Sequence, residues 1–201
     1  MQLISYISQT FANVPTVFDY LAANVPWLTA EGDTLTVGNL TLEKSATTAI
    51  KITDSAAGAT LTTPSVSVSN ANFKILITDT AVMVCQNTTG QAVAMSSFIV
   101  GKSTDGTNDH YGAVIRTETS SGAAETVLTY GAANVLSNGT RKVISSANIT
   151  QMIPVYSNET AYNVENAYLV FMTTQTSYVG KMELNGAKYV QCGGLALQYT
   201  E

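Results

Sequence analysis

The fold class of this chain is decided by residues 33–42, which read DTLTVGNLTL. Apolar residues alternate with threonine on both sides of Gly38-Asn39, and this alternation is typical of half-buried β-strands. Glycine and asparagine are common turn residues. The stretch therefore predicts two short antiparallel strands joined by a tight turn.

Similar patterns continue to the C-terminus. Asn-Gly pairs at 138–139 and 185–186 predict hairpins, because both central residues of a type I′ turn need positive φ. Ser121-Gly122 predicts a turn between strands at 112–119 and 125–130. Residues 53–65 read as a connector. The other expected strands are 50–52, 66–68, 73–77, 82–84, 93–100, 168–172 and 195–199.

The N-terminal segment has a different pattern. Leu3, Ile4, Ile7 and Phe11 lie at spacings that fit a helix, and the sequence Ala-Asn-Val-Pro occurs at both 12–15 and 23–26. Asparagine can end a helix, and a following proline prevents its continuation. We therefore expect two short helices, at 2–12 and 16–23.

Helices this short are not stable alone in water, so their apolar faces must pack on the body of the protein or on a partner. The candidate interface residues are the larger apolar side chains of this segment: Leu3, Ile7, Phe11, Phe18, Leu21 and Trp27.

These patterns predict a mainly β protein, an antiparallel β-sandwich or barrel-like domain preceded by a short N-terminal helical segment. We expect three parts: a helical attachment or interface segment at 1–30, short strands and a Thr/Ala/Gly-rich connector at 31–65, and an antiparallel β-domain at 66–201. A chain of 201 residues can bury a substantial core, and we expect the third part to fold independently.

Charged residues make up 11% of the chain, against about 25% in ordinary soluble domains. Few charges are therefore available to guard strand edges against pairing with other molecules. We expect a stable homo-oligomer, with a trimer as the favoured form. A net charge of −5 with nine Lys and Arg argues against nucleic acid and anionic membranes as partners. Polar residues interrupt the N-terminal apolar run, so we expect no membrane-spanning helix.

The sequence carries no recognisable catalytic motif. Gly101-Lys102-Ser103 resembles the end of a phosphate-binding loop, but Ser96 stands where the pattern needs glycine. His110 has no nucleophile elbow beside it. We place Lys102 and His110 in a surface turn and expect neither to be functional.

Carboxylates give no stronger signal. Asp105 and Asp109 lie in a turn-like loop that lacks the distal glutamate of an EF-hand calcium site. Glu118 and Glu125 flank a predicted hairpin turn and could lie close together, but we interpret them as solubilising charges. We therefore predict no enzymatic activity, no metal and no cofactor.

Cysteines and tyrosines leave two questions open. Cys85 and Cys192 are favoured as buried free thiols, although a disulfide between them is an alternative. Tyrosines crowd the final third, where packing across a sheet is favoured and a surface for sugars or proteins is the alternative. These tyrosines are Tyr156, Tyr162, Tyr168, Tyr178, Tyr189 and Tyr199.

Two segments resemble parts of bacteriophage proteins. Residues 32–42 resemble the short Thr/Gly strand repeats of phage fibre and tail proteins, and residues 182–190 with 193–197 are similar to the closing hairpins of phage virion proteins. The resemblance implies a structural subunit of a virion: a fibre, tail, baseplate or capsid-decoration protein. Such subunits usually act by assembly and adhesion, often as homotrimers. No functional residues carry over.

The implied partners are copies of the chain, other virion proteins and a host-surface glycan. The expected location is the virion, after synthesis in the host cytoplasm. The alternatives are a virion-borne glycan-binding or depolymerase protein and a bacterial surface adhesin.

Overall fold

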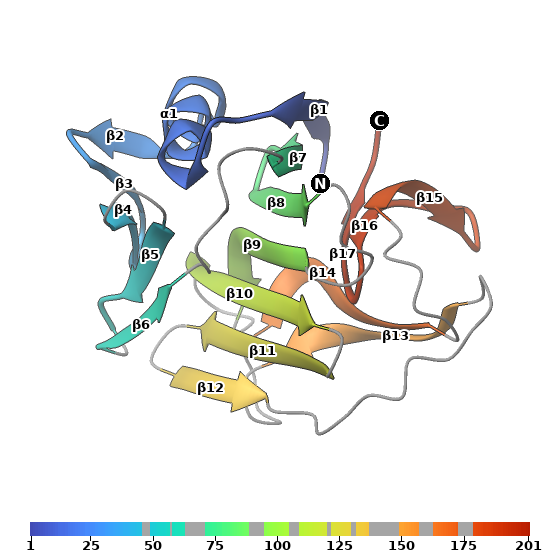
Figure 1. The fold of residues 1–201 in the computed structure, drawn as a ribbon. Coiled ribbons are helices and arrows are strands. Elements are labelled where there is room, and N and C mark those ends of the chain that lie inside the picture. The colour runs from blue at the N-terminus through green and yellow to red at the C-terminus, as the bar shows by residue number, and fades with distance from the viewer. Residues whose placement is uncertain are drawn as a thin grey trace.

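The computed structural model is mainly β, with antiparallel strands in a sandwich-like arrangement and one short helix near the N-terminus, which confirms the predicted fold class (Figure 1). The residues that the structure describes are 1–45, 49–56, 58–62, 71–88, 95–104, 109–119, 122–129, 132–136, 149–156, 163–172 and 179–201.

The strands form a 12-stranded sheet and a five-stranded sheet. The large sheet contains β1 (Leu3–Thr10), β7 (Ala71–Thr78), β8 (Ala81–Thr88), β9 (Met95–Thr104), β10 (Asp109–Thr119), β11 (Gly122–Thr129), β12 (Ala132–Leu136), β13 (Ile149–Tyr156), β14 (Asn163–Met172), β15 (Val179–Leu184), β16 (Ala187–Cys192) and β17 (Leu195–Tyr199). The small sheet contains β2 (Thr29–Glu31), β3 (Thr34–Val37), β4 (Leu40–Ser45), β5 (Ala49–Asp54) and β6 (Ala59–Thr62). The helix is α1 (Val14–Asn24).

The main path of the large sheet runs β1-β7-β8-β9-β14-β17-β16-β15, while β10, β11 and β12 extend from β9 and β13 pairs with β14. The sheet curls so that the N-terminus and the C-terminus of the chain lie side by side. Leu3 N donates to Thr200 O at 2.7 Å, and Thr200 N donates to Met1 O at 2.8 Å. The N-terminal residues therefore bridge β7 and the end of β17, which gives this part of the sheet a barrel-like form.

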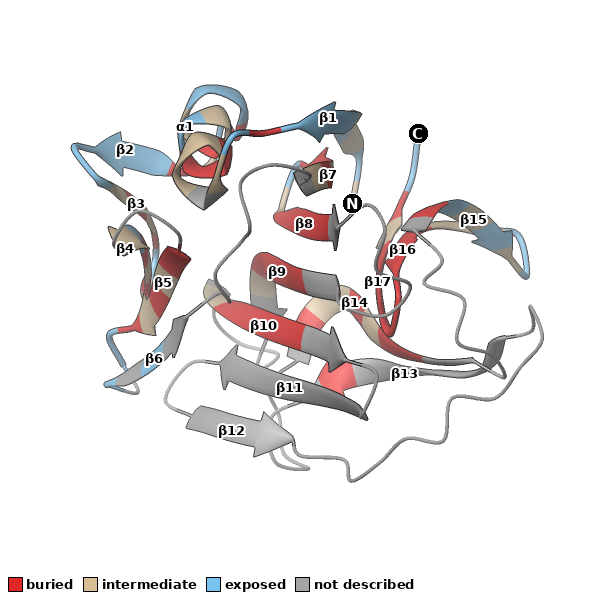
Figure 2. Cartoon of the chain, viewed as in Figure 1, coloured by how far each residue is buried: buried red, intermediate tan, exposed pale blue. Residues whose placement is uncertain are grey.

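Both faces of strands β7 to β10 are buried (Figure 2). In β7, Ile75 and Ile77 point to one core while Leu76 points to the other. In β8, Val82 and Val84 point to the same core as Ile75 and Ile77, and Met83 points to the same core as Leu76. This explains the nearly continuous apolar runs of these strands, since a strand that is covered on both faces has no solvent side.

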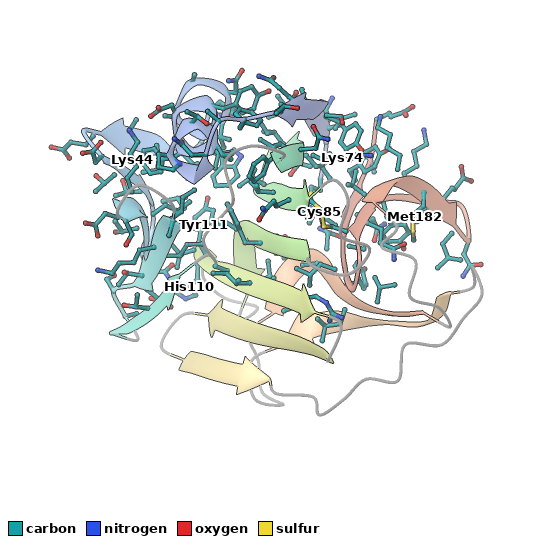
Figure 3. The ribbon with its side chains drawn as sticks, in the orientation of Figure 1. Lys44, Lys74, Cys85, His110, Tyr111 and Met182 are labelled. Carbon is teal, nitrogen blue, oxygen red and sulfur yellow. A yellow bond between two sulfur atoms is a disulfide. The ribbon has the colours of Figure 1, made fainter. Side chains whose placement is uncertain are left out.

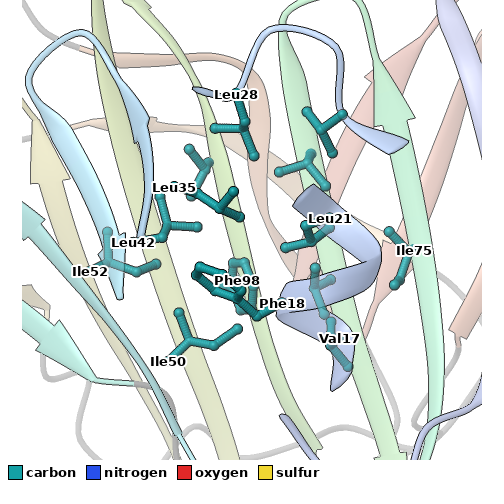
Figure 4. Packing of buried hydrophobic residues seen from close by; sticks show 14 of the residues in the cluster. Val17, Phe18, Leu21, Leu28, Leu35, Leu42, Ile50, Ile52, Ile75 and Phe98 are labelled. Atoms are coloured by element: carbon teal, nitrogen blue, oxygen red, sulfur yellow. The ribbon is translucent and has the colours of Figure 1, made fainter. Parts of the chain in front are cut away.

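We call the first cluster the outer core. It lies between the large sheet and a cover formed by α1 and the small sheet (Figure 4). Val17, Phe18 and Leu21 come from the helix, and Leu35, Leu42, Ile50 and Ile52 come from the small sheet. All seven are at most 1% exposed. The helix and the small sheet therefore supply one side of the outer core.

We call the second cluster the inner core. It lies where strands β14, β16 and β17 fold back toward β7, β8 and β9, and it contains Leu76, Met83, Ile99, Leu169, Val190 and Leu197. Cys85 of β8 and Cys192 of β16 form a disulfide inside it, with their Cα atoms 5.9 Å apart (Figure 3). The favoured interpretation of two free thiols was wrong.

The helix predicted over 2–12 was also wrong, because residues 3–10 form strand β1. Ile7 and Phe11 are four residues apart, and this spacing keeps side chains on one face of a strand as well as one face of a helix. Pairing of β1 with β7, from Ser5 opposite Ile77 to Thr10 opposite Asn72, decides between the two. Leu3 faces the inner core instead, because the β1–β7 register shifts between Leu3 and Ser5.

The second predicted helix exists, and its two ends use the repeated Ala-Asn-Val-Pro sequence differently. Asn13 begins the helix: its Oδ1 accepts from Thr16 N at 2.9 Å, and Thr16 Oγ1 accepts from Asn13 N in a capping box. Pro15 lies in the first turn, where its missing N–H is harmless. The helix ends within the second copy, at Asn24 rather than at the predicted residue 23, and its C-cap is Val25 in an extended conformation.

Other strand predictions had mixed outcomes. The hairpin around Asn185-Gly186 is confirmed, with φ of 52° and 77° at the two turn residues. The pairs β3–β4 and β10–β11 are also confirmed. The predicted connector at 53–65 was partly wrong, because β6 lies within it. The Asn138-Gly139 turn and the 66–68 strand lie outside the described residues.

Candidate assembly surface

The six apolar residues predicted for an interface differ in how far they are buried and in which core they contact. Phe11, Phe18 and Leu21 are at most 6% exposed within the outer core. Ile7 and Trp27 are half-buried against that core, and Leu3 is half-buried against the inner core. Much of this apolar surface thus packs inside the chain. Its role toward a partner stays a prediction.

Trp27 ties the N-terminal segment to the large sheet. Its Nε1 donates to Thr78 O at 2.9 Å, and its ring stacks on Tyr111 with centroids 6.1 Å apart. The side chain of Asn39 binds the backbone of Tyr111. Asn39 Nδ2 donates to Tyr111 O, and Tyr111 N donates to Asn39 Oδ1, both at 2.9 Å. A Cβ on Gly38 would lie 2.9 Å from the Tyr111 ring, so the turn needs glycine there. These contacts fasten the small sheet to β10.

Lys44 fastens the helix to the small sheet. Its Nζ lies 2.7 Å from Asp19 Oδ1 and 3.3 Å from Asp33 Oδ1, and 5.2 Å from the centroid of the Phe18 ring. Hydrogen bonding to Asp19, followed by that to Asp33, raises the pKa of Lys44 above its ordinary value. The ammonium stays charged at neutral pH and joins α1 to the β2–β3 turn.

The two ends of the chain carry a second cluster of polar contacts. Lys181 Nζ of β15 lies 5.2 Å from the Tyr6 ring centroid and 5.5 Å from that of Tyr199. Lys188 Nζ lies 2.7 Å from Glu201 Oε2, a hydrogen bond that raises the pKa of Lys188 and lowers that of Glu201. The Lys181–Tyr6 contact joins β15 to β1, and the Lys188–Glu201 pair joins β16 to the C-terminal residue.

Strand β1 combines exposure with an open edge. It pairs with β7 on one side, and no strand in the described part of the chain pairs with residues 5–10 on the other side. Ser8, Gln9 and Thr10 are exposed. Ile4, at 46%, is the large hydrophobic side chain that stands out as exposed among the described residues. Its position falls in an irregularity of the β1–β7 register between Leu3 and Ser5.

The edge of β1 also lacks charge. The eight residues of the strand read LISYISQT, and the first charged residue of the chain is Asp19. Natural proteins usually guard edges with charges, prolines or short strands. Three other strands at the margins of the two sheets follow that rule: β15 carries Lys181 and Glu183, β13 contains Pro154, and β2 has only three residues. β12, with the sequence AANVL, is an edge strand of five residues that has neither charge nor proline. β1 is thus a long edge without these guards.

The sequence pattern predicts a helix over residues 3–10, so it does not reveal their edge as a site, and Ile4 is absent from the candidate interface. The signal that could have revealed the edge is the run of uncharged residues before Asp19 combined with alternating Ile4, Tyr6 and Ser8.

The weaker motif candidates lie on strands. Lys102 is opposite Tyr111 in the β9–β10 ladder and His110 is opposite Ser103, so the prediction that both lie in a surface turn was wrong. Glu118 is opposite Ala123 and Glu125 is opposite Arg116, two register positions apart on neighbouring strands. The described residues hold no group of three or more metal-binding side chains, and Asp105 lies outside them.

Two tyrosines of the final third pack against each other. The rings of Tyr168 and Tyr189 meet edge to face with centroids 5.8 Å apart, and Tyr168 Oη lies 3.1 Å from Gln198 Oε1. Both tyrosines are half-buried. Packing across the sheet is thus present at this pair, and each ring keeps part of its surface accessible.

In the part of the chain that the structure describes, no helix is long and apolar enough to cross a membrane. Comparison with family models, curated proteins and solved structures found no match to this chain. The sequence and the geometry above therefore carry the functional conclusion.

Proposed function

We propose that this protein is a structural subunit of a bacteriophage virion, of the fibre, tail, baseplate or capsid-decoration type. It acts by assembling with copies of itself and with other particle proteins. The single observation that supports assembly best is the open, uncharged edge of β1 with Ile4 exposed on it. A sheet edge is a surface on which a strand of a neighbouring chain can add to the sheet.

Composition supports the same proposal. A chain with 11% charged residues presents a largely neutral surface, which weakens the electrostatic repulsion between copies. The resemblance of residues 32–42 to the strand repeats of phage fibre and tail proteins, and of residues 182–190 with 193–197 to the closing hairpins of phage virion proteins, supports the virion assignment. Neighbouring genes for capsid, portal or tail proteins would support it further.

Light scattering over a range of micromolar concentrations tests self-assembly. We expect the mass of a homo-oligomer, with three copies favoured, against 21.2 kDa for one chain. A monomer at every concentration would contradict the proposal that the chain associates with itself.

A second candidate function, binding of a host-surface glycan, is favoured by the half-buried Tyr168–Tyr189 pair with Gln198 beside it. Aromatic rings and amides are suited to the apolar faces and hydroxyls of sugars. Binding to a glycan array by the native protein, lost in Tyr189→Ala but kept in Tyr20→Ala, would support this role. No binding by the native protein, or equal binding by both variants, would reject it.

A further inference from the structure

We infer that Cys85 and Cys192 are still thiols when the chain folds, and that the disulfide between them forms afterwards, in an oxidising environment outside the cell. The bond then stabilises a fold that is already complete. This order of events depends on the proposed function only for the two places involved, because a virion protein is made in a cytoplasm and acts outside it. Disulfides are rare in a reducing cytoplasm, whereas they form and persist in oxidising surroundings.

The strands that carry the two cysteines are held in place without the bond. Cys85 lies in β8, which pairs with β7 and β9, and Cys192 lies in β16, which pairs with β15 and β17. β8 and β16 are not neighbours in the sheet, so the disulfide joins two separate ladders across the inner core. Their Cα atoms are 5.9 Å apart, within the usual range for a disulfide. The dithiol chain therefore needs no backbone shift to become oxidised.

Folding before oxidation also carries no risk of a wrong pairing. The chain contains two cysteines, so oxidation within one chain has a single product. Cys85 is 0% exposed and Cys192 is 1% exposed, among apolar residues such as Met83 and Leu197. Because neither side chain reaches the surface of the folded chain, a bond to a second copy is disfavoured.

Burial determines how the bond forms and how long it lasts. A cysteine buried in an apolar core is inert toward reagents in solution, so the core must open locally before its thiols react. β16 lies beside β15, the last strand on the main path of the large sheet, whereas β8 lies between two strands with both faces buried. Opening of the β15–β16 hairpin therefore exposes Cys192 first. Once the core has closed again, the disulfide is shielded from reducing agents.

The oxidant that fits this step is a small-molecule disulfide such as oxidised glutathione. The Cys192 thiolate attacks one sulfur of the oxidant, which forms a mixed disulfide and releases one small thiol. The Cys85 thiolate then attacks Cys192 Sγ, which forms the protein disulfide and releases the second small thiol. The two protein thiols together give up two protons and two electrons, and the oxidant is reduced to two thiols.

Thiol counting before and after oxidation tests this order. The native chain is made in a reducing bacterial cytoplasm, the cells are quenched in acid, and the unfolded protein is treated with N-ethylmaleimide. We expect mass spectrometry to show both cysteines labelled. The purified dithiol protein should unfold cooperatively in guanidinium. Oxidised glutathione should then remove both thiols and lower the unfolded fraction at a fixed guanidinium concentration at least about a hundredfold.

The matched control is Cys85→Ala with Cys192→Ala, whose unfolding transition oxidised glutathione should leave unchanged. A disulfide that is already complete in the quenched cells would overturn the inference. A dithiol chain without a cooperative transition would also overturn it, because the bond would then be needed for folding. Thiols that persist in the folded native protein under oxidised glutathione would show that the bond does not form after folding. None of these results depends on the mass of the assembly, so a monomer at every concentration would contradict the proposed self-assembly alone.

Discussion

The inner and outer cores share the same strands but are closed in different ways. The inner core is crossed by the Cys85–Cys192 disulfide, which links segments 107 residues apart. The outer core is closed by α1, the small sheet and the Trp27 and Asn39 contacts to the large sheet, all of them non-covalent in the described residues. The inner core is therefore held by a covalent bond, whereas the outer core depends on residues 1–62 for its cover.

This difference shows what the N-terminal part does within the chain. Residues 1–62 supply β1, the helix and the small sheet, and so they cover one whole face of strands β7 to β10. At the same time they present the open edge of β1. Core formation and the proposed assembly surface belong to the same segment.

The largest expected effect comes from removing the outer cover. A chain without residues 1–62 would expose Phe73, Ile75, Ile77, Val82 and Phe98, and each large apolar side chain is worth about 1.5–3 kcal/mol when buried. Several such losses match the whole stability of a domain, about 5–15 kcal/mol. We expect the shortened chain to lack a cooperative thermal transition.

Calorimetry of the shortened chain checks this expectation, with full-length Phe18→Ala as a graded control that loses about 3–5 kcal/mol and still unfolds cooperatively. If the shortened chain unfolds cooperatively near the native temperature, residues 66–201 are an independent domain, as the sequence suggested.

Loss of the disulfide should have the next largest effect on stability. Replacing both cysteines, Cys85→Ala with Cys192→Ala, removes a link that closes a loop of about 100 residues, for which chain entropy gives roughly 4–5 kcal/mol. We expect the free energy of unfolding in guanidinium to fall by about 3–5 kcal/mol, with the fold retained. The native protein measured with a reducing agent should show a similar loss. A loss below about 1 kcal/mol in both experiments would mean that packing alone holds the inner core.

A smaller effect is expected where the turn after β16 meets β10. Arg116 is buried at 4% exposure, and a Cβ on Gly194 would overlap its guanidinium group. Gly194→Ala should therefore cost about 1–3 kcal/mol through overpacking. A double-mutant cycle with Arg116→Ala separates this clash from other effects, because Gly194→Ala should cost little once the guanidinium is gone. Equal costs in both backgrounds would show that the contact is not responsible.

The smallest effect concerns the Lys188–Glu201 pair near the chain end. Its hydrogen bond lowers the pKa of Glu201 below 4.5, so the stabilising contribution is present at neutral pH and is lost as the pH falls through the folded pKa. The raised pKa of Lys188 means that the contribution is lost again as the pH rises above 10.5. We expect Lys188→Met to flatten the stability profile slightly at the acid end relative to the native protein. A Lys188→Met profile identical to that of the native protein at the acid end would contradict the assignment.

The sequence predicted the strands whose pattern was unambiguous. The alternating stretch 33–42, the Asn185-Gly186 turn and the strand 195–199 were all found where expected. In each, the residues that form the element are adjacent in the chain. Local turn chemistry and alternation were therefore sufficient.

Features that depend on distant residues were not predictable in this way. Spacing by four residues in 3–11 fits a helix or a strand, and pairing with β7 decides it. The disulfide joins residues 107 positions apart, and two cysteines alone do not indicate that they meet. The contact of Asn39 with Tyr111 likewise depends on how the small sheet packs on β10. The open edge of β1 was missed because β1 itself was missed.

Amide hydrogen exchange at low and high protein concentration tests the central claim, that the chain assembles with copies of itself at the edge of β1, most directly. We predict that exchange of the β1 amides slows as the concentration rises, while the amides of the exposed edge strand β2 (Thr29–Glu31) do not change. An increase in mass with no slowing anywhere in Leu3–Thr10 would contradict the claim and place the contact on another surface.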